Sequence, residues 1–244
     1  MEPPAISQKT RPKVIATIPC FDTGSVIADV VLRTSKYVDR VVVIDDGSRD
    51  STAAAARGAG ALVVSHGSNR GYGEAIKSCF EVGRQERADV LVILDGDNQH
   101  NPDDIQYLLE PILRGEADLT IGSRFLGHDL KIPAYRRFGI GVITGLWNFG
   151  SRIKVSDTQS GFRAYSRQFF LDLPLAARGM SVSIEILENA RRMGVTIKEV
   201  PISCFYQSSA PSLRAFKQGL GVAFSVIKYR LKRRRGQPTK GTES

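Results

Sequence analysis

The residues with the clearest chemical potential follow an apolar stretch near the middle of the chain. Asp95, Asp97 and Gln99 come directly after residues 90–94, which have the pattern of a buried strand. In an extended backbone, side chains at every second position point the same way, so these three could present oxygen ligands together. Oxygen ligands suit Mg²⁺ or Mn²⁺, and such an ion could stabilise a diphosphate leaving group. A turn that caps a helix ahead of Pro102 is the alternative interpretation.

A second acidic pair ends another apolar stretch. Asp45 and Asp46 are followed by Gly-Ser, which is an ordinary turn sequence, and Ser51 could cap the next helix. Beside the first acidic group, the pair could instead hydrogen-bond a ribose or a base. Residues 69–74 open a further helix, whose N-terminus would favour an anion. This segment lacks the third glycine of a dinucleotide fingerprint, so a glycine-rich connection is the simpler interpretation when it is taken alone.

These residues fall at the ends of apolar strands that alternate with helices. The strands are predicted over residues 14–18, 41–44, 61–65, 90–94, 119–121 and 196–203. The helices are predicted over residues 25–38, 71–86, 102–113, 135–153, 181–193 and 213–235. Such alternation indicates an α/β fold with a mostly parallel sheet covered on both faces, whose ligands bind beyond the carboxyl ends of the strands. Four strand ends are expected to converge: Pro19, Asp45–Asp46, Asp95–Asp97 and Ser123–Arg124.

Length and composition fit one α/β domain. The chain has 244 residues, of which 42% are hydrophobic and 24% charged, which excludes a disordered or low-complexity protein. Its three cysteines form no Cys-x-x-Cys pair, so we expect neither a disulfide scaffold nor a cysteine zinc site. Residues 1–13 contain no apolar signal-peptide region, and the apolar residues 138–151 are fewer than the ~20 that span a bilayer. We therefore expect a cytoplasmic protein that does not cross a membrane by itself.

The positive charge is concentrated at the carboxyl end. The formal net charge is +9, and residues 228–244 carry a net +6 of it. This basic end follows the amphipathic helix, which we place over residues 211–235, and precedes a tail over residues 236–244. A polybasic segment beside an apolar helix face binds anionic membranes, whereas a solvated tail is the alternative. A nucleic-acid-binding protein would also be basic, but its function would leave the acidic strand ends unexplained, so we expect no nucleic-acid partner.

Taken together, the motifs resemble those of the family 2 glycosyltransferases of the GT-A fold. Within that family they resemble the dolichyl-phosphate mannose synthase-like enzymes, which act on polyprenyl phosphates. The resemblance covers residues 14–212 and is carried by Ile18–Pro19, Val43–Ser48, Asn69–Gly71, Leu94–His100, Gly122–Arg124 and Asp157–Arg163. It implies a polar segment over residues 1–12 and a Rossmann-like GT-A domain over residues 13–210, flanked by helices and followed by the amphipathic helix.

The resemblance also implies roles for the residues at the strand ends. The residues expected to bind the nucleotide are Pro19, Asp22, Asp45, Asp46, Asn69 and Asp95. The expected ligands of Mg²⁺ or Mn²⁺ are Asp95, Asp97 and Gln99. The residues expected at the reacting centre are Asp97, Arg124 and Asp157. Arg124 would lie near the donor sugar and the diphosphate, and Asp157 would be a catalytic or orienting group.

Basic residues further along the chain would bind phosphate groups. The residues expected to bind the acceptor phosphate are Arg136, Arg137, Ser160 and Arg163, and Arg214 would contact the diphosphate. Arg214 stands one residue away from the lysine that the family usually has. Residues 20–22, Cys-Phe-Asp, replace the tyrosine-asparagine-glutamate of the synthases, so the base contacts differ and the choice between GDP and UDP stays open.

The implied reaction is transfer of a sugar from GDP-mannose or a UDP-sugar to a polyprenyl phosphate. A lipid phosphate is already anionic near neutral pH, so it can attack the anomeric carbon without a strong base. Positioning and metal-assisted departure of the nucleoside diphosphate would carry the catalysis, with inversion to a β-linked product. Residues 135–153 would be an interfacial helix that attaches the protein peripherally to the cytoplasmic face of a membrane, which leaves room for a separate membrane-anchoring subunit.

Two other enzymatic functions share some of these features. A glycosyltransferase of the same fold could act on a soluble or protein-linked acceptor, and a lack of affinity for lipid phosphate would favour it. A phosphatase with an Asp-x-Asp nucleophile fits less well, because Gln99 stands where that motif usually has threonine.

Overall fold

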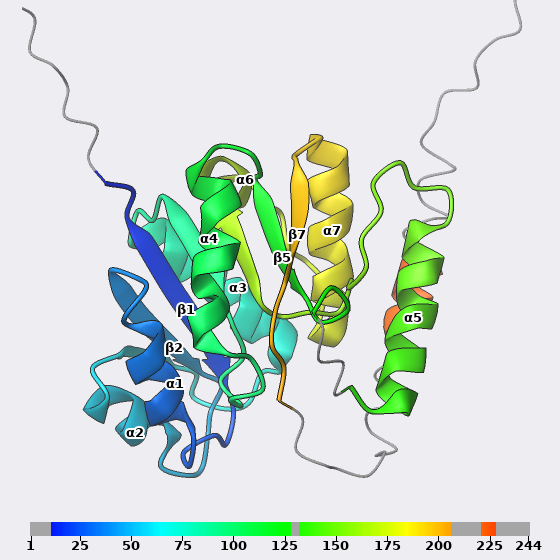
Figure 1. Cartoon of the computed structure of the whole chain (residues 1–244). Helices are drawn as coiled ribbons and strands as arrows, with labels where there is room; N and C mark the ends of the chain where they lie inside the picture. Colours follow the sequence, from blue (N-terminus) through cyan, green and yellow to red (C-terminus); the bar gives the residue numbers. More distant parts are fainter. Residues whose placement is uncertain (1–10, 128–131, 206–220, 228–244) are drawn as a thin grey trace, which may run out of the picture.

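A seven-stranded sheet runs through the part of the chain that the computed structural model describes, residues 11–127, 132–205 and 221–227 (Figure 1). Its order is β3-β2-β1-β4-β6-β5-β7. The strands are β1 (Val14–Cys20), β2 (Arg40–Asp45), β3 (Leu62–Ser65), β4 (Val90–Ile93), β5 (Leu119–Ser123), β6 (Arg163–Ser166) and β7 (Ile197–Pro201). All pairs of neighbours are parallel except those of β6, which is antiparallel to both β4 and β5. The predicted α/β fold with a mostly parallel sheet is confirmed.

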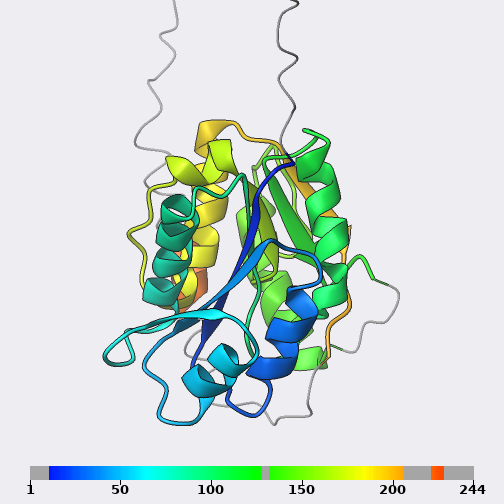
Figure 2. The same cartoon turned by 90° about the vertical axis from the view of Figure 1, so that its left-hand side faces the viewer.

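Helices cover both faces of the sheet (Figure 2). They are α1 (Ile27–Thr34), α2 (Thr52–Gly58), α3 (Tyr72–Gln85), α4 (Ile105–Leu113), α5 (Ala134–Asn148), α6 (Arg167–Leu171) and α7 (Val182–Met193). Two short 3₁₀ turns, η1 (Pro102–Asp104) and η2 (Gly179–Ser181), lead into α4 and α7. The helices α1, α2 and α4 pack on one face, and α3, α6 and α7 pack on the other. The α5 helix lies at one end of the molecule (Figure 1).

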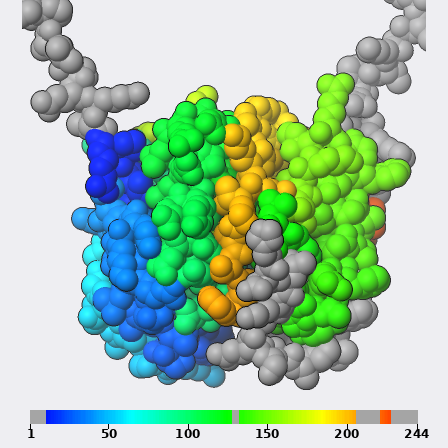
Figure 3. Space-filling model, in the orientation of Figure 1, coloured from blue at the N-terminus to red at the C-terminus, as the bar shows by residue number. Residues whose placement is uncertain are grey.

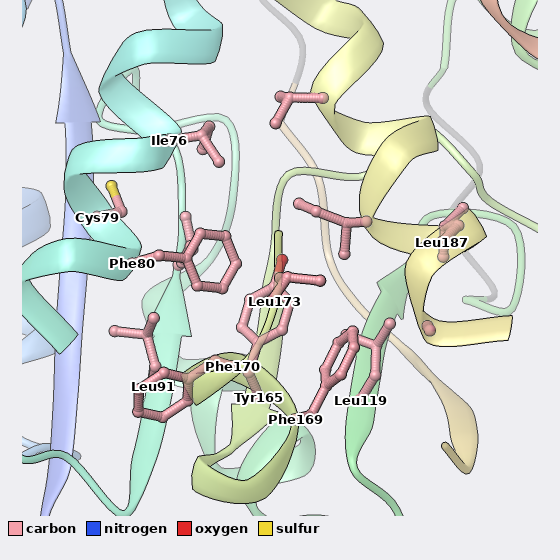
Figure 4. Packing of buried hydrophobic residues seen from close by; sticks show 14 of the residues in the cluster. Ile76, Cys79, Phe80, Leu91, Leu119, Tyr165, Phe169, Phe170, Leu173 and Leu187 are labelled. Atoms are coloured by element: carbon pink, nitrogen blue, oxygen red, sulfur yellow. The ribbon is translucent and has the colours of Figure 1, made fainter. Parts of the chain in front are cut away.

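Large aromatic side chains fill the core between the sheet and the α3–α7 layer (Figure 4). Phe80 of α3 meets Tyr165 of β6 edge-on, with ring centroids 4.9 Å apart. Phe169 and Phe170 of α6 belong to the same cluster and pack beside Tyr165. Burying one such ring stabilises the fold by about 2–3 kcal/mol. This layer stabilises the sheet at the amino ends of β4 and β5, where Tyr165 pairs with Leu91 and Leu119.

The β6 strand is one of the elements absent from the predicted ranges, together with the short helices α2 and α6. It has only four residues and begins with an arginine, so it shows no apolar run. Because β6 is antiparallel to β4 and β5, it begins at the edge where those strands end. The loop that leads into it, residues 155–162, therefore reaches the same edge as the acidic strand ends.

The α5 helix ends earlier than the predicted residue 153. Its last residue is Asn148, whose side chain turns back to hydrogen-bond both the N–H and the carbonyl of Val155, at 3.0 and 2.8 Å. Gly150 then adopts a positive φ of 64°, which reverses the chain. The apolar pattern continues past this point, so periodicity alone placed the boundary too late.

The predicted C-terminal helix is described only over residues 221–227, which are helical. Val222 and Val226 are buried in the core beside α7, whereas Phe224 and Ile227 are exposed. Arg214, the basic end, residues 1–10 of the predicted polar segment 1–12 and the predicted tail 236–244 lie outside the described residues. Within the described ranges, the helices are too short or too polar to span a bilayer.

Candidate functional site

The acidic residues after β4 lie at the carboxyl edge of the sheet, Asp95 half-buried and Asp97 exposed. Tyr72 donates a hydrogen bond of 3.3 Å to Oδ1 of Asp95, and the Nδ1 atom of His100 is 3.9 Å from its Oδ2. Burial raises the pKa of Asp95 to about 7, and repulsion from Asp97 adds to this rise. Burial also raises the pKa of Asp97. Two carboxylates whose charged forms are disfavoured in this way suit a bound cation, which would stabilise both.

The Gln99 side chain lies against Asp97. The backbone N–H of Gln99 donates to Asp97 Oδ1 at 3.1 Å, and its Nε2 donates to Oδ2 at 2.7 Å. In the described ranges, groups of three or more His, Cys, Asp or Glu residues suited to a metal do not occur. Two carboxylates and an amide oxygen are nevertheless a donor set that fits Mg²⁺ or Mn²⁺, whose remaining ligands are usually phosphate oxygens and water. The structure thus brings together the three ligands that the sequence predicted.

Two glycines allow the chain to close around this group. A Cβ atom on Gly161 would lie 2.5 Å from Asp95 Oδ2, and one on Gly96 would lie 2.2 Å from the Sγ atom of Cys20. Both distances are far below van der Waals contact. The loop before β6 therefore approaches the Asp95 carboxylate closely through Gly161, a residue without a side chain.

Gly161→Ala is expected to weaken Mn²⁺ binding by about tenfold, because the new methyl group displaces the Asp95 carboxylate. Isothermal titration calorimetry with Mn²⁺ measures the change. Gly58→Ala is the control, since a Cβ atom there meets no atom within 4 Å. Equal Mn²⁺ affinities for the two variants would show that Asp95 does not bind the metal.

Mn²⁺ affinity is expected to depend on pH. The pKa of Asp95 is about 7, so below that pH a proton competes with the cation for the carboxylate. We expect the Mn²⁺ affinity to fall by about tenfold for each pH unit below 7 and to level off above it. The free energy of unfolding of the metal-free protein should instead fall as the pH rises towards 7. The folded state binds the Asp95 proton more tightly than the unfolded chain does, and this stabilisation is lost as the proton leaves. Calorimetric Mn²⁺ titrations between about pH 5.5 and 8 test this; a flat profile would contradict it.

The ends of β1 and β2 are joined by side-chain hydrogen bonds. Asp45 is buried and accepts from the backbone N–H of Ser48 at 3.0 Å. Asp22 has a positive φ of 52°, accepts from the N–H of Arg49 at 2.9 Å and donates its own N–H to the hydroxyl of Ser48. Pro19 is buried within β1. The predicted nucleotide residues of these two strands thus adjoin one another.

Asp46 anchors the loop ahead of α3. Its carboxylate accepts from the backbone N–H groups of Arg70 and Gly71, at 2.9 and 2.8 Å, and lies 2.6 Å from Nδ1 of His66. The other ring nitrogen of His66 lies 2.9 Å from the hydroxyl of Ser78 on α3. The sequence analysis missed His66, which has no motif of its own. It also missed this anchoring role of Asp46, whose contact with a nucleotide stays a prediction, as does that of the exposed Asn69.

The close approach of this loop depends on Gly47. Gly47 has a positive φ of 75°, and a Cβ atom there would lie 2.5 Å from the backbone of Ser68. A glycine is therefore required by both the backbone conformation and the space. The Asp-Gly pair is more than an ordinary turn, because its glycine lets the loop after β2 pack against the loop after β3.

Arg124 and Asp157 form a two-pronged ion pair. Nε and Nη2 of Arg124 donate to the two carboxylate oxygens of Asp157, at 2.6 and 2.8 Å, and the Arg124 backbone N–H adds a bond of 3.3 Å. Asp157 is 0% exposed. Burial alone would raise its pKa, but the hydrogen bonds and charge of Arg124 outweigh burial and lower the pKa. Asp157 is therefore an anion that orients Arg124.

The His100 side chain is neutral and lies near both Asp95 and Arg124. Burial lowers its pKa to about 3, and the charge of Arg124 lowers it further. Its ring centroid lies 5.3 Å from that of Phe162, and its backbone bridges to Cys204 after β7. The sequence places His100 in the acidic motif but gives no indication that it is buried there.

The predicted acceptor residues divide into two groups. Arg136 of α5 lies close enough to Asp97 that its charge lowers the pKa of that carboxyl, against the effect of burial. Arg137 is exposed on the same helix. In contrast, Arg163 is 1% exposed and donates to the carbonyls of Thr158 and Ser183, at 2.9 and 3.3 Å.

Arg163 and Ser160 are thus placed inside the molecule. The Ser160 hydroxyl is 0% exposed and accepts from the N–H of Phe162 at 3.3 Å. Both side chains are buried, unlike that of Arg137, and their contact with an acceptor phosphate stays a prediction. Both side chains hydrogen-bond within residues 158–163, the segment that joins Asp157 to β6, and so stabilise it.

Comparison with known proteins agrees with this arrangement. Residues 16–173 match the model of the family described as Glycosyl transferase family 2. The UDP-N-acetylglucosamine–dolichyl-phosphate N-acetylglucosaminyltransferase of Methanococcus voltae is 28% identical over 216 residues, which cover 78% of this chain and 84% of that protein. The polyprenol monophosphomannose synthase of Mycolicibacterium smegmatis is 29% identical over 215 residues, with coverages of 83% and 80%.

A solved structure shares the fold. Glucosyl-3-phosphoglycerate synthase from Mycobacterium tuberculosis, in complex with Mn²⁺ and UDP-glucose, superposes with a TM-score of 0.74 at 23% identity. The match covers 94% of this chain and 81% of that chain. The family match includes β1 to α6 and with them all the strand ends of the site, whereas β7 lies beyond it.

Proposed function

The chain belongs to glycosyltransferase family 2 and has the GT-A fold, and on this premise we propose that it transfers a sugar from a nucleotide-diphosphate sugar to a polyprenyl phosphate. The observation that carries the proposal is the acidic group of Asp95, Asp97 and Gln99 at the carboxyl edge of the sheet. Relatives that act on dolichyl and polyprenyl phosphates support the acceptor class. The names of these relatives refer to different sugars, N-acetylglucosamine and mannose, so the proposal keeps both GDP-mannose and a UDP-sugar as donors.

The donor lies across the ends of β1, β2 and β4 in this proposal. The nucleoside contacts the edge formed by Pro19, Asp22 and Asp45, and the diphosphate lies beside Asp95 and Asp97. When Mg²⁺ or Mn²⁺ is bound by these carboxylates and Gln99, it neutralises the charge that develops on the departing diphosphate. Arg214 also contacts the diphosphate.

The acceptor phosphate attacks the anomeric carbon from the side opposite the diphosphate. A bond from a phosphate oxygen to the anomeric carbon forms while the carbon–oxygen bond to the diphosphate breaks, so the configuration inverts. Arg136 and Arg137 attract the acceptor phosphate, and Arg136 already lies near Asp97. Arg124, oriented by Asp157, stabilises negative charge near the donor. The acceptor is an anion at neutral pH, so Asp157 is not needed as a base.

An exposed apolar surface suits contact with the lipid. Phe138 and Phe149, on and just after α5, are 75% and 70% exposed, and Phe224 of the 221–227 helix is 69% exposed. The two helices lie side by side, and Figure 3 shows α5 (green) at the outer side of the molecule. Exposed aromatic rings beside arginines are typical of segments that enter the headgroup region. The proposal therefore includes peripheral attachment to the cytoplasmic face of a membrane, with or without a separate anchoring subunit.

Phe138→Ser is expected to weaken binding to anionic lipid vesicles by about tenfold, because the ring no longer enters the membrane. Co-sedimentation with vesicles of phosphatidylglycerol and phosphatidylcholine measures this. Leu32→Ser removes a 55% exposed side chain from α1 and serves as the control, with binding expected to equal that of the native protein. If both variants bound as well as the native chain, α5 would not be a membrane contact.

The direct test is transfer of labelled sugar from GDP-mannose, UDP-glucose and UDP-N-acetylglucosamine to a polyprenyl phosphate with Mg²⁺ or Mn²⁺. The expected product is a β-linked glycosyl phosphate lipid from one of these donors, and a chelator should stop its formation. An α-linked product would contradict inversion. Consumption of one donor with a soluble acceptor or water, and none with the lipid, would instead favour a family member with a soluble or protein-linked acceptor.

A further inference from the structure

Glu199 of β7 accepts three hydrogen bonds from one short segment of the site. Its Oε2 atom accepts from the backbone N–H of Ser156 at 2.7 Å. Its Oε1 atom accepts from the Ser156 hydroxyl at 2.9 Å and from the backbone N–H of Asp157 at 3.1 Å. Both oxygens of the half-buried Glu199 carboxylate therefore bind Ser156 and Asp157, and Asp157 is the residue that pairs with Arg124.

A directional chain of hydroxyl groups extends this contact to β5. Because the Ser156 hydroxyl donates to Glu199, it can only accept from the Ser123 hydroxyl, which lies 2.6 Å away. The Ser123 oxygen in turn accepts from the N–H of Phe125 at 3.2 Å. In the sheet, Glu199 pairs with Ile121 of β5, two residues before Ser123. The carboxylate thus sets the direction of the two hydroxyl bonds in this chain, from Ser123 to Ser156 and from Ser156 to Glu199.

We propose that Glu199 is a positioning residue that fixes the Asp157 carboxylate and, through it, the guanidinium of Arg124. The backbone N–H of Asp157 is held by Glu199, and its carboxylate takes both prongs of Arg124. Asp157 is therefore held at both its backbone and its carboxylate, and these contacts fix the orientation of its side chain. The inference rests on the proposed function, in which Arg124 stabilises the donor charge.

A glutamine cannot replace Glu199 here. In either amide orientation, the NH₂ group would face a backbone N–H, of Ser156 or of Asp157, and a buried donor would lose its acceptor. An aspartate keeps the charge but is shorter by one methylene, so it cannot hold both neighbours at the same distances. The site therefore uses both the charge and the length of glutamate.

The test compares Glu199→Gln with Glu116→Gln. Glu116 is ion-paired with Lys198, the neighbour of Glu199 on β7, and both side chains are about half exposed, so the same substitution is made next to the same strand but outside the site. We expect Glu199→Gln to lower kcat by about 30-fold or more and to change the KM for the donor by less than about threefold. Glu116→Gln should retain native kcat and KM. A change in KM alone, or no change, would overturn the proposal.

A second readout does not depend on activity. The Arg124 Nε–H group, which donates to Asp157 at 2.6 Å, gives an NMR signal that can be assigned by its loss in Arg124→Lys. We expect its exchange with solvent to be at least about tenfold faster in Glu199→Gln than in the native protein or in Glu116→Gln. Unchanged exchange in a folded Glu199→Gln variant would overturn the inference even if no sugar transfer were ever detected.

A double-mutant cycle separates positioning from a general loss of stability. If Glu199 acts through Asp157, adding Glu199→Gln to Asp157→Asn should lower kcat by less than about twofold further. Losses of kcat that multiply would show that Glu199 acts independently of Asp157 and would contradict the proposal. Native protein that is inactive towards every donor and acceptor would count against the proposed function, whereas the NMR result would still decide the role of Glu199.

Discussion

Replacing Asp97 with alanine is expected to lower the rate of sugar transfer at least about 1000-fold and to abolish measurable Mn²⁺ binding. Asp97 is an exposed carboxylate beside the half-buried Asp95, and repulsion from Asp97 helps to raise the pKa of Asp95, so a cation at this point is attracted by both charges. Its loss also removes the acceptor for both donors of Gln99, so the third ligand is released as well. Labelled sugar transfer and Mn²⁺ calorimetry on the same preparation measure the two effects.

Asp103→Ala is the control for Asp97. Asp103 lies six positions further along, is partly exposed and pairs with Arg33 away from the strand ends. It should keep native transfer and native Mn²⁺ affinity. If Asp97→Ala retained more than about a tenth of the native rate, the metal would have to be held elsewhere, and the acidic group after β4 would be only a turn.

Replacing Asp157 with asparagine is expected to lower the transfer rate by about 100- to 1000-fold and the free energy of unfolding by about 3 kcal/mol. The substitution leaves the Arg124 guanidinium, itself nearly buried, without its counter-charge. Because the pKa of Asp157 is lowered in the folded state, the ion pair stabilises the protein above the carboxyl's unfolded pKa and is lost only as the pH falls through the lower folded value. Urea unfolding and initial-rate assays give the two quantities.

Two companion variants make the Asp157 result specific. Arg124→Lys keeps the positive charge but loses the planar fork, so it should lose activity with a smaller loss of stability. Asp172→Asn neutralises an exposed carboxylate and should change neither quantity. Full transfer activity in Asp157→Asn would show that orientation of Arg124 is not part of the catalysis.

The strand ends could be predicted because their signal is local. An apolar run followed by Asp-x-Asp-x-Gln predicted the strand and a group of polar side chains after it, and the structure brings Asp97 and Gln99 into contact. The contact does not come from the extended backbone that we expected, because β4 ends at Ile93 and Asn98 has a positive φ of 59°, so the chain turns between Asp97 and Gln99. The parallel order of the sheet then gathers the ends of β1, β2 and β4. Each step needed only neighbouring residues and a general property of parallel sheets.

The supports of the site could not be predicted in the same way. Arg163 has the sequence context of a phosphate ligand, yet the antiparallel pairing of β6 buries it. His66 and Glu199 meet their partners 20 and more positions away along the chain, at Asp46 and Ser156. Periodicity and turn residues contain no information about such distant contacts.

The position of β6 divides the sheet into two parts joined by one seam. The strands β3, β2, β1 and β4 form one parallel block that carries the acidic residues, and β5 and β7 form another that carries Arg124 and Glu199. Within the sheet, the blocks share no ladder of their own, and the four residues of β6 bond to both. The seam lies between the strand that precedes Asp97 and the strand that precedes Arg124. The gap between these two residues therefore depends on the four residues of β6 and on the loop that leads into it.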